Sequence, residues 1–213
     1  MLLSSKFTEI SIVNYGIGNI GSLQSALKKI GFFPKLIESE KDFKASNNII
    51  FPGVGAAKPA MSVVSQLIGE NSYEVLLKKP RRVLGICLGL QILMDKSLEG
   101  GSTDCMGIFE GVVSPIPVEY ESKIPRIGWF PIIRNPSQNK SLIESSFAIE
   151  ADEFYFAHSY YVNLGNNSYC TYFTSKLNFP AIIEKDNVIG VQFHPEKSGR
   201  IGLNLLKQIF TYK

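Results

Sequence analysis

Hydrophobic and polar positions follow two different periods in the first half of the chain. Short β-branched runs predict buried strands, and segments whose apolar residues recur every three or four positions predict helices. Glycines and prolines separate the two kinds of segment. The expected strands are 10–14, 48–51 and 83–86, and the expected helices are 19–30, 59–68 and 88–94. Strands separated by helices imply right-handed crossovers and a mostly parallel sheet.

The pattern changes after residue 107, where segments become short, aromatic and β-branched. They predict strands at 154–156, 169–174, 181–184 and 188–193, with a hairpin turn at Asp186 and Asn187. An amphipathic helix is predicted at 201–210. We therefore expect one α/β domain over 1–213, with a mostly parallel central sheet, flanking helices and added antiparallel strands.

The composition is that of a globular chain and excludes several classes of function. Of 213 residues, 45% are hydrophobic and 19% charged, which favours a sizeable core over disorder. A net charge of +3 is too small to predict nucleic-acid binding. No apolar run is long enough to span a membrane, and the N-terminus lacks a signal-peptide pattern. Three scattered cysteines make no disulfide framework, so we expect a reducing, cytoplasmic location.

The most informative stretch is Leu-Gly-Ile-Cys-Leu-Gly-Leu-Gln, over 84–91. Cys87 stands between two glycines where an expected strand meets an expected helix, which is the pattern of a nucleophile elbow. Such a turn raises the thiol above the sheet, and the N–H groups that follow can stabilise a thiolate or an oxyanion. The alternative is a buried core cysteine. Cys105 and Cys170 are interpreted as packing residues.

A base for Cys87 must be one of the two histidines, His158 or His194. His194 ends an expected strand, and Glu196 lies two residues later, on the same side of an extended chain. Pro195 is expected to keep the segment extended. Glu196 could then orient the imidazole as in a catalytic triad. The alternative makes His194 a strand-end cap, while His158 is interpreted as a loop histidine near the site.

A third candidate feature is the turn Phe-Pro-Gly-Val-Gly-Ala over 51–56, which follows an expected buried strand. Backbone N–H groups of Gly53 or Val54 could complete an oxyanion hole with that of Leu88. An ordinary structural turn is the alternative. Phosphate binding is disfavoured, because the segment contains neither Gly-Lys-Ser/Thr nor Gly-x-Gly-x-x-Gly.

Together and in this order, these motifs resemble the class I, triad-type glutamine amidotransferase family. The Gly-Ile-Cys-Leu-Gly-Leu-Gln turn and the segment Phe-His-Pro-Glu-Lys-Ser over 193–198 carry the resemblance. Within that family, the whole chain is similar to the glutaminase subunits of imidazole glycerol phosphate synthases. The stretches that support this narrower resemblance are 14–19, 51–56, 123–129 and 154–161.

The resemblance implies an enzyme that hydrolyses the side-chain amide of L-glutamine with no metal ion or other cofactor. Cys87 would be the nucleophile, His194 the acid and base, and Glu196 the carboxylate that holds His194. The expected oxyanion hole consists of Gly53, Val54 and Leu88. The residues expected to contact glutamine are Gly55, Gln91, Glu99, Ser159 and Tyr160.

The resemblance also implies a separate (β/α)₈-barrel cyclase, with which the chain would form a heterodimer. Ammonia would pass to the cyclase, which makes imidazole glycerol phosphate and an aminoimidazole carboxamide ribotide in histidine biosynthesis. No nucleic-acid or membrane partner is expected. The residues expected at the interface are Asn14, Asn19, Trp129 and Lys197.

Three residues depart from the usual pattern of these glutaminases and leave the partner open. Phe130 replaces the usual Asn, Arg126 stands where His is common, and Ala56 stands where an aromatic residue often follows the glycine. One alternative is a paralogous glutaminase that feeds a different synthase, such as a surface-polysaccharide sugar amidotransferase. The others are a non-catalytic scaffold subunit and a free-standing hydrolase of γ-glutamyl peptides. The sequence also leaves open whether the oxyanion turn is preformed.

Overall fold

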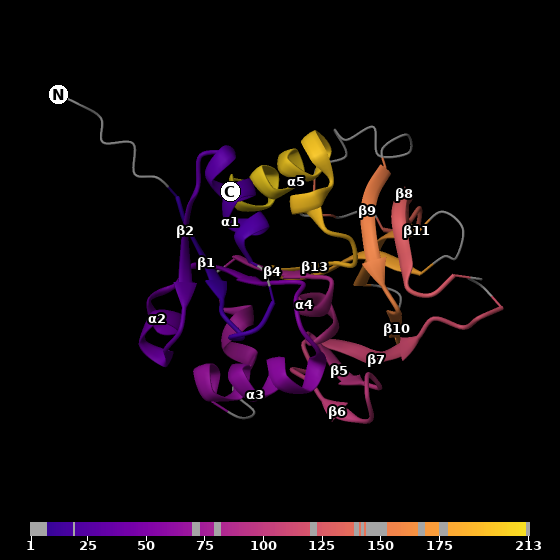
Figure 1. Cartoon of the computed structure of the whole chain (residues 1–213), viewed down its shortest axis with the longest axis horizontal. Helices are drawn as coiled ribbons and strands as arrows, with labels where there is room; N and C mark the ends of the chain where they lie inside the picture. The colour runs from indigo at the N-terminus through magenta and orange to yellow at the C-terminus, as the bar shows by residue number, and fades with distance from the viewer. Residues whose placement is uncertain are drawn as a thin grey trace.

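The computed structural model describes residues 8–18, 20–69, 73–78, 82–119, 123–138, 141, 143, 153–165, 169–174 and 179–211. Within these residues, the predicted α/β class is confirmed, because helices flank a large mixed sheet (Figure 1). The main sheet has nine strands in the order β2-β1-β3-β4-β13-β12-β11-β8-β9 among the described residues. A smaller sheet, in the order β10-β7-β5-β6, lies beside it.

The first five strands of the main sheet run parallel to one another. They are β2 (Phe33–Ile37), β1 (Glu9–Val13), β3 (Asn48–Phe51), β4 (Arg82–Ile86) and β13 (Val188–Val191). Their residues are apolar almost without a break in β3, β4 and β13, as expected for strands that are covered on both faces.

The remaining strands of the main sheet pair antiparallel and form its second half. They are β12 (Pro180–Lys185), β11 (Cys170–Thr174), β8 (Arg126–Arg134) and β9 (Glu153–His158). Asp186 has a φ of 54° in the predicted hairpin turn between β12 and β13. The smaller sheet contains β10 (Tyr160–Leu164), β7 (Phe109–Pro115), β5 (Met94–Ser97) and β6 (Thr103–Asp104).

Helices cover both faces of the parallel half of the main sheet (Figure 1). On one face, α1 (Gly21–Lys29) and α5 (Gly199–Thr211) enclose one core layer. The other layer contains α3 (Ala57–Ile68), α4 (Leu88–Gln91) and the smaller sheet. The shorter helices are α2 (Glu40–Ala45), η1 (Tyr73–Leu77) and η4 (Pro195–Lys197).

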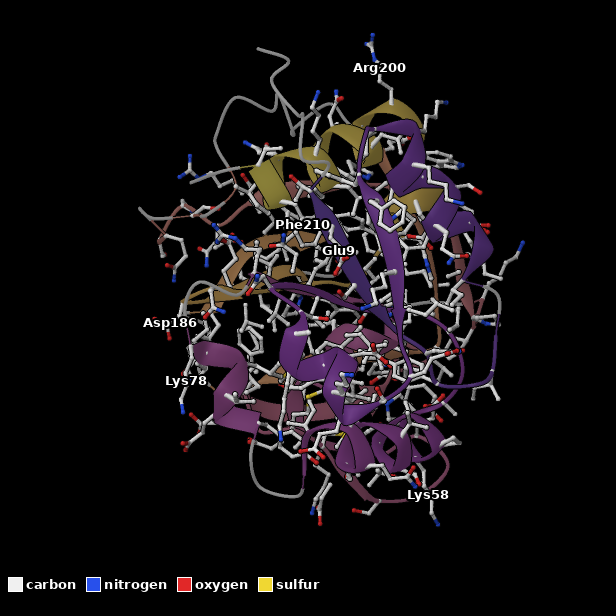
Figure 2. The ribbon with its side chains drawn as sticks, turned by 90° about the vertical axis from the view of Figure 1, so that its left-hand side faces the viewer. Glu9, Lys58, Lys78, Asp186, Arg200 and Phe210 are labelled. Atoms are coloured by element: carbon white, nitrogen blue, oxygen red, sulfur yellow. The ribbon has the colours of Figure 1, made fainter. Side chains whose placement is uncertain are left out.

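Several charged side chains of the helices and connections are exposed. Figure 2 shows Lys58, Lys78 and Arg200 pointing outward from the ribbon. Among the helices that the structure describes, none is long and apolar enough to cross a membrane.

The helix predicted at 88–94 is shorter than expected, because α4 ends at Gln91 and Met94 already belongs to β5. Every residue from 88 to 94 is buried, so the segment has no polar face that could distinguish a helix from a strand. Pairing of Met94 with Phe109 of β7 decides in favour of the strand. Some predicted elements have shifted ends: α1 begins at Gly21, α3 begins at Ala57 and β13 ends at Val191. The sequence analysis did not predict β2, α2, β5, β6, β7, β8 or β10.

Candidate active site

Cys87 occupies the sharp turn between β4 and α4. Its φ of 48° and ψ of −104° form a conformation that costs a non-glycine residue on the order of 1–3 kcal/mol. The glycines on either side allow close packing there. A Cβ on Gly89 would overlap the carbonyl oxygen of Phe51, and one on Gly85 would lie 2.6 Å from the carbonyl oxygen of Gly89. Strands β3 and β4 and helix α4 therefore approach so closely that only glycine fits at positions 85 and 89, as a nucleophile elbow requires.

His194 and Glu196 form a buried pair directly after β13. Nδ1 of His194 lies 2.8 Å from Oε1 of Glu196, and the two side chains are 5% and 9% exposed. The expected extended segment is wrong, because Pro195–Lys197 is a 3₁₀ turn and this turn brings the carboxylate to the ring. On its other side the imidazole hydrogen-bonds to Cys87.

Gly53 lies against both Cys87 and His194. A Cβ at this position would come within 2.9 Å of the Cβ of Cys87 and of Cε1 of His194. The glycine-rich turn after β3 therefore lies directly beside the thiol and the imidazole. Val54 is partly buried against the core instead, and a Cβ on Gly18 would lie 2.5 Å from its Cβ.

The surroundings of His194 favour its charged form and raise its pKa to about 9. Burial disfavours the charge, but the hydrogen bonds to Cys87 and Glu196, together with their negative charge, outweigh burial. At neutral pH the ring of His194 is therefore an imidazolium.

The other two cysteines lie in different surroundings. Burial is the largest influence on both thiols and raises the pKa of Cys105 and of Cys170 to about 12. Cys170 is fully buried in β11, and Cys105 packs against the core. Both stay protonated at neutral pH, which agrees with their interpretation as packing residues.

Ser198 connects the segment that carries His194 to β9 through hydrogen bonds. This role was not predicted from the sequence. Its hydroxyl donates to the carbonyl of His194 at 2.7 Å and accepts from the N–H of Tyr155 at 3.0 Å. The N–H of His194 in turn donates to the carbonyl of Tyr155 at 2.8 Å. A serine four residues after a histidine is a weak signal, and its role depends on β9, which is distant in sequence.

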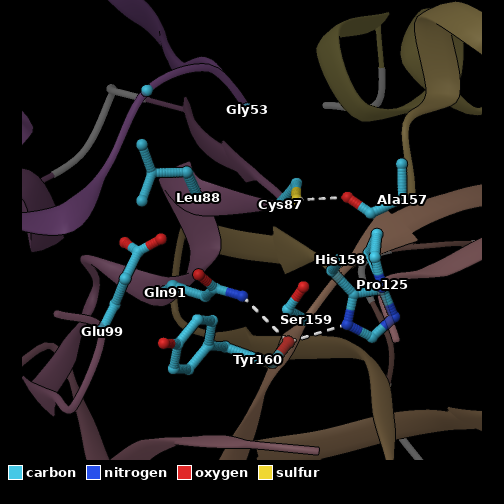
Figure 3. Close-up of a pocket in the computed structure, with 11 residues that line it drawn as sticks. Gly53, Cys87, Leu88, Gln91, Glu99, Pro125, Ala157, His158, Ser159 and Tyr160 are labelled. Atoms are coloured by element: carbon cyan, nitrogen blue, oxygen red, sulfur yellow. Dashed lines mark hydrogen bonds between the residues drawn. The ribbon is translucent and has the colours of Figure 1, made fainter. Parts of the chain in front are cut away.

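A pocket of about 200 Å³ lies beside Cys87 (Figure 3). The turn after β3, α4 and the connection from β9 to β10 all contribute to its wall. Every residue expected to contact glutamine lines it, whereas His194, Glu196 and Val54 are not among the described lining residues. The lining residues are Gly53, Gly55, Cys87, Leu88, Gln91, Glu99, Pro125, Ala157, His158, Ser159 and Tyr160.

Several polar groups of the pocket are already held by hydrogen bonds. The amide of Gln91 donates to the carbonyl of Tyr160 at 3.1 Å, as Figure 3 shows. A carboxylate oxygen of Glu99 accepts from the N–H of Ala57, the first residue of α3, at 2.8 Å. This bond also places a negative charge at the N-terminus of the helix, where it is favourable. Gln91 and Glu99 are therefore fixed before any ligand binds.

We expected His158 to lie in a loop, but it is the last residue of β9 and is 5% exposed. Sequence analysis correctly placed it near the site, because it lines the pocket. The strand predicted at 154–156 ended two residues before the observed end of β9 at His158. No metal site was expected, and among the described residues no cluster of three His, Cys, Asp or Glu side chains is arranged to hold one.

The residues expected at the interface have different surroundings. Trp129 is 47% exposed on β8, and its ring packs edge-on against Tyr155 at 5.9 Å. Nζ of Lys197 lies 5.9 Å from the same tyrosine ring. Asn14 is half-buried and donates to Glu38 at 2.9 Å within the chain. Asn19 lies outside the described residues.

Comparisons with known proteins agree with this geometry. The family model described as glutamine amidotransferase class-I matches residues 11–211. An "imidazole glycerol phosphate synthase subunit HisH" from Caldanaerobacter subterraneus subsp. tengcongensis is 40% identical over 201 residues, which cover 93% of this chain and 95% of that relative. A protein of the same name from Pyrobaculum aerophilum is 36% identical over 203 residues, 95% of this chain and 97% of the relative.

Solved structures show the same fold at low sequence identity. The structure of PurLQS from Thermotoga maritima has a TM-score of 0.75 and 20% identity, over 97% of this chain and 99% of that one. A structure described as a glutamine amidotransferase has a TM-score of 0.70 and 15% identity, over 94% and 98% of the two chains. On the family match and the identity to these relatives, the chain belongs to the class I glutamine amidotransferase family.

Proposed function

We propose that the chain is the glutaminase subunit of an imidazole glycerol phosphate synthase and supplies ammonia to a separate (β/α)₈-barrel cyclase. One observation carries the glutaminase part. Cys87 stands in a strained turn with the buried His194–Glu196 pair on one side and a pocket on the other. The names of relatives that match over nearly their full length support the choice of synthase.

In the proposed reaction, the thiolate of Cys87 attacks the side-chain carbonyl carbon of glutamine and forms a C–S bond. The carbonyl oxygen becomes an oxyanion, stabilised by the N–H groups of Leu88 and of Gly53 or Val54. The imidazolium of His194 then gives its proton to the leaving nitrogen, so that the C–N bond breaks and ammonia departs.

The second half of the reaction removes the thioester. Neutral His194 takes a proton from water as the water oxygen attacks the thioester carbon. Breakage of the C–S bond releases glutamate and restores the thiolate and the imidazolium. Glu196 holds the ring of His194 through both halves, as the orienting member of a triad does.

We also propose that the cluster of the exposed Trp129 and Lys197 with the half-buried Tyr155 contacts the cyclase. Exposed aromatic residues beside a cation are typical of interface residues with large binding energies. The backbone of Tyr155 holds His194 through two hydrogen-bonded connections, so this cluster adjoins the catalytic histidine. Asn14 and Asn19 remain proposed contacts. We place the heterodimer in the cytoplasm, where a thiol nucleophile stays reduced.

The alternative of a different synthase depended on Arg126 and Phe130. Both side chains lie on the inner face of β8, where Arg126 is 1% exposed and its guanidinium lies 3.7 Å from the ring centroid of Phe130. The outer face, which carries Trp129, is therefore not altered by these two departures. No observation favours a second partner over the cyclase.

Cys87→Ala should abolish glutamate release from glutamine, because the thioester cannot form. The assay uses the purified chain alone and then with a barrel cyclase and its ribotide ligand. If the wild type is active only with the cyclase, the result would support an oxyanion turn that docking completes. If the wild type is active without the cyclase, the result would support a preformed turn. Cys105→Ala serves as the control and should keep wild-type turnover. Near wild-type turnover by Cys87→Ala would disprove the assigned nucleophile.

The two histidines should titrate far apart. His194, with a pKa of about 9, should be protonated at pH 7, and His158, with a pKa of about 4, should be neutral. Nitrogen-detected NMR of the imidazole rings can follow both, since the chain has two histidines. Glu196→Gln should lower the pKa of His194, because it removes the stabilising carboxylate. A wild-type His194 that titrates near 6.5 would contradict the charged pair.

Trp129→Ala and Lys197→Ala should weaken binding to the cyclase by about tenfold or more while leaving the melting temperature nearly unchanged. Titration calorimetry with the cyclase measures the affinity. Phe33→Ala is the matched control, since Phe33 is 58% exposed on β2 at the opposite edge of the main sheet. If all three variants bound the cyclase as tightly as the wild type does, the interface would lie elsewhere.

A further inference from the structure

Two side chains of the pocket wall converge on one carbonyl oxygen (Figure 3). The carbonyl of Tyr160 accepts from Nε2 of Gln91 at 3.1 Å and lies 2.7 Å from Nδ1 of His158. Because a carbonyl oxygen can only accept, Nδ1 of His158 must carry the proton. The peptide at Tyr160 is thus held from α4, next to the nucleophile, and from the end of β9.

This peptide lies where the chain leaves one sheet for the other. Ser159 alone separates β9 of the main sheet from β10 of the smaller sheet. The carbonyl of Ser159 accepts from the N–H of Ile116 at 2.9 Å, and the carbonyl of Tyr160 is held by the two side chains. Side-chain donors therefore satisfy the carbonyl of Tyr160 here, whereas backbone N–H groups satisfy carbonyls within a continuous strand ladder.

The surroundings of His158 keep its ring neutral. Arg126 is its direct partner across β8 and β9, so both side chains lie on the same face. The guanidinium lies 3.7 Å from the ring centroid of Phe130 and 5.0 Å from that of Phe156, whose ring is 5.7 Å from the imidazole. Burial lowers the pKa of His158 to about 4. The hydrogen bond to Tyr160 opposes this shift, and the charges of Arg126 and His194 add to it.

We propose that His158 is a positioning residue of the glutaminase, which fixes the Ser159–Tyr160 wall of the glutamine pocket by donating from Nδ1 to the Tyr160 carbonyl. The proposal rests on the proposed function, since it assumes that glutamine occupies this pocket. His158 acts through Tyr160 rather than on the reacting bond. Nε2 of His158 is buried and accepts no hydrogen bond from the described residues. The ring therefore acts through the hydrogen bond that Nδ1 donates to Tyr160.

Two substitutions separate the donor from the bulk of the ring. His158→Asn keeps an N–H donor near the place of Nδ1, whereas His158→Gln moves the amide toward the place of Nε2. Loss of a buried hydrogen bond of this kind corresponds to about a tenfold effect. His158→Phe keeps the ring volume without any donor and serves as the second variant if His158→Gln does not fold.

The experiment uses the chain together with the cyclase and its ribotide ligand. It measures the rate at which a γ-chloroketone analogue of glutamine alkylates Cys87, with iodoacetamide as a small reagent that needs no pocket. We expect His158→Gln and His158→Phe to slow the analogue about tenfold relative to iodoacetamide. His158→Asn should stay within about threefold of wild type, because it keeps the donor.

The outcomes distinguish the two proposals. If the analogue fails to label Cys87 in the wild-type chain faster than iodoacetamide does, the proposed function fails. If it labels the wild type selectively and His158→Asn is as slow as His158→Gln, His158 only fills space and the positioning role is wrong. Equal rates in all variants would likewise overturn it.

Discussion

The rest of the site depends on the strained backbone at Cys87. A residue with a side chain is held at a φ of 48°, and the glycines before and after it let β4, α4 and β3 pack without room for a Cβ. The strain is offset by burial of the surrounding strands and by the hydrogen bond from the N–H of Cys87 to the carbonyl of Val191 at 2.7 Å. As a result the thiol stands at the edge of the sheet, between a histidine and a pocket.

Parallel pairing explains how residues far apart in sequence meet there. Val191 of β13 pairs with Ile86 of β4, so the segments that follow both strands leave the sheet at the same edge. One carries Cys87 and the other carries His194, which matches the general placement of sites at the carboxyl ends of parallel strands. The antiparallel strand β9 then lines the other side of the pocket with Ala157 and His158.

Much of this could be predicted from the sequence, because the main signals are local. The strand at 48–51 and the elbow at Cys87 depend on short motifs and on apolar runs, and the residues expected around glutamine follow from the family resemblance that these motifs carry. The roles of Ser198 and His158 could not be predicted, since they depend on β9 lying beside the histidine segment and β8. The contact of Glu196 was expected for the wrong reason: a 3₁₀ turn, not an extended chain, brings it to the ring.

The most direct test of this account compares the stability of Cys87→Gly with that of Cys87→Ala by chemical denaturation. Both variants lack the sulfur, so their difference reports the strain of a Cβ at this φ minus the larger unfolded-state entropy of glycine. We predict that Cys87→Gly has the larger free energy of unfolding, by about 1 kcal/mol, because glycine adopts this conformation without strain. Equal stability, or a more stable Cys87→Ala, would contradict a strained elbow as the feature on which the site depends.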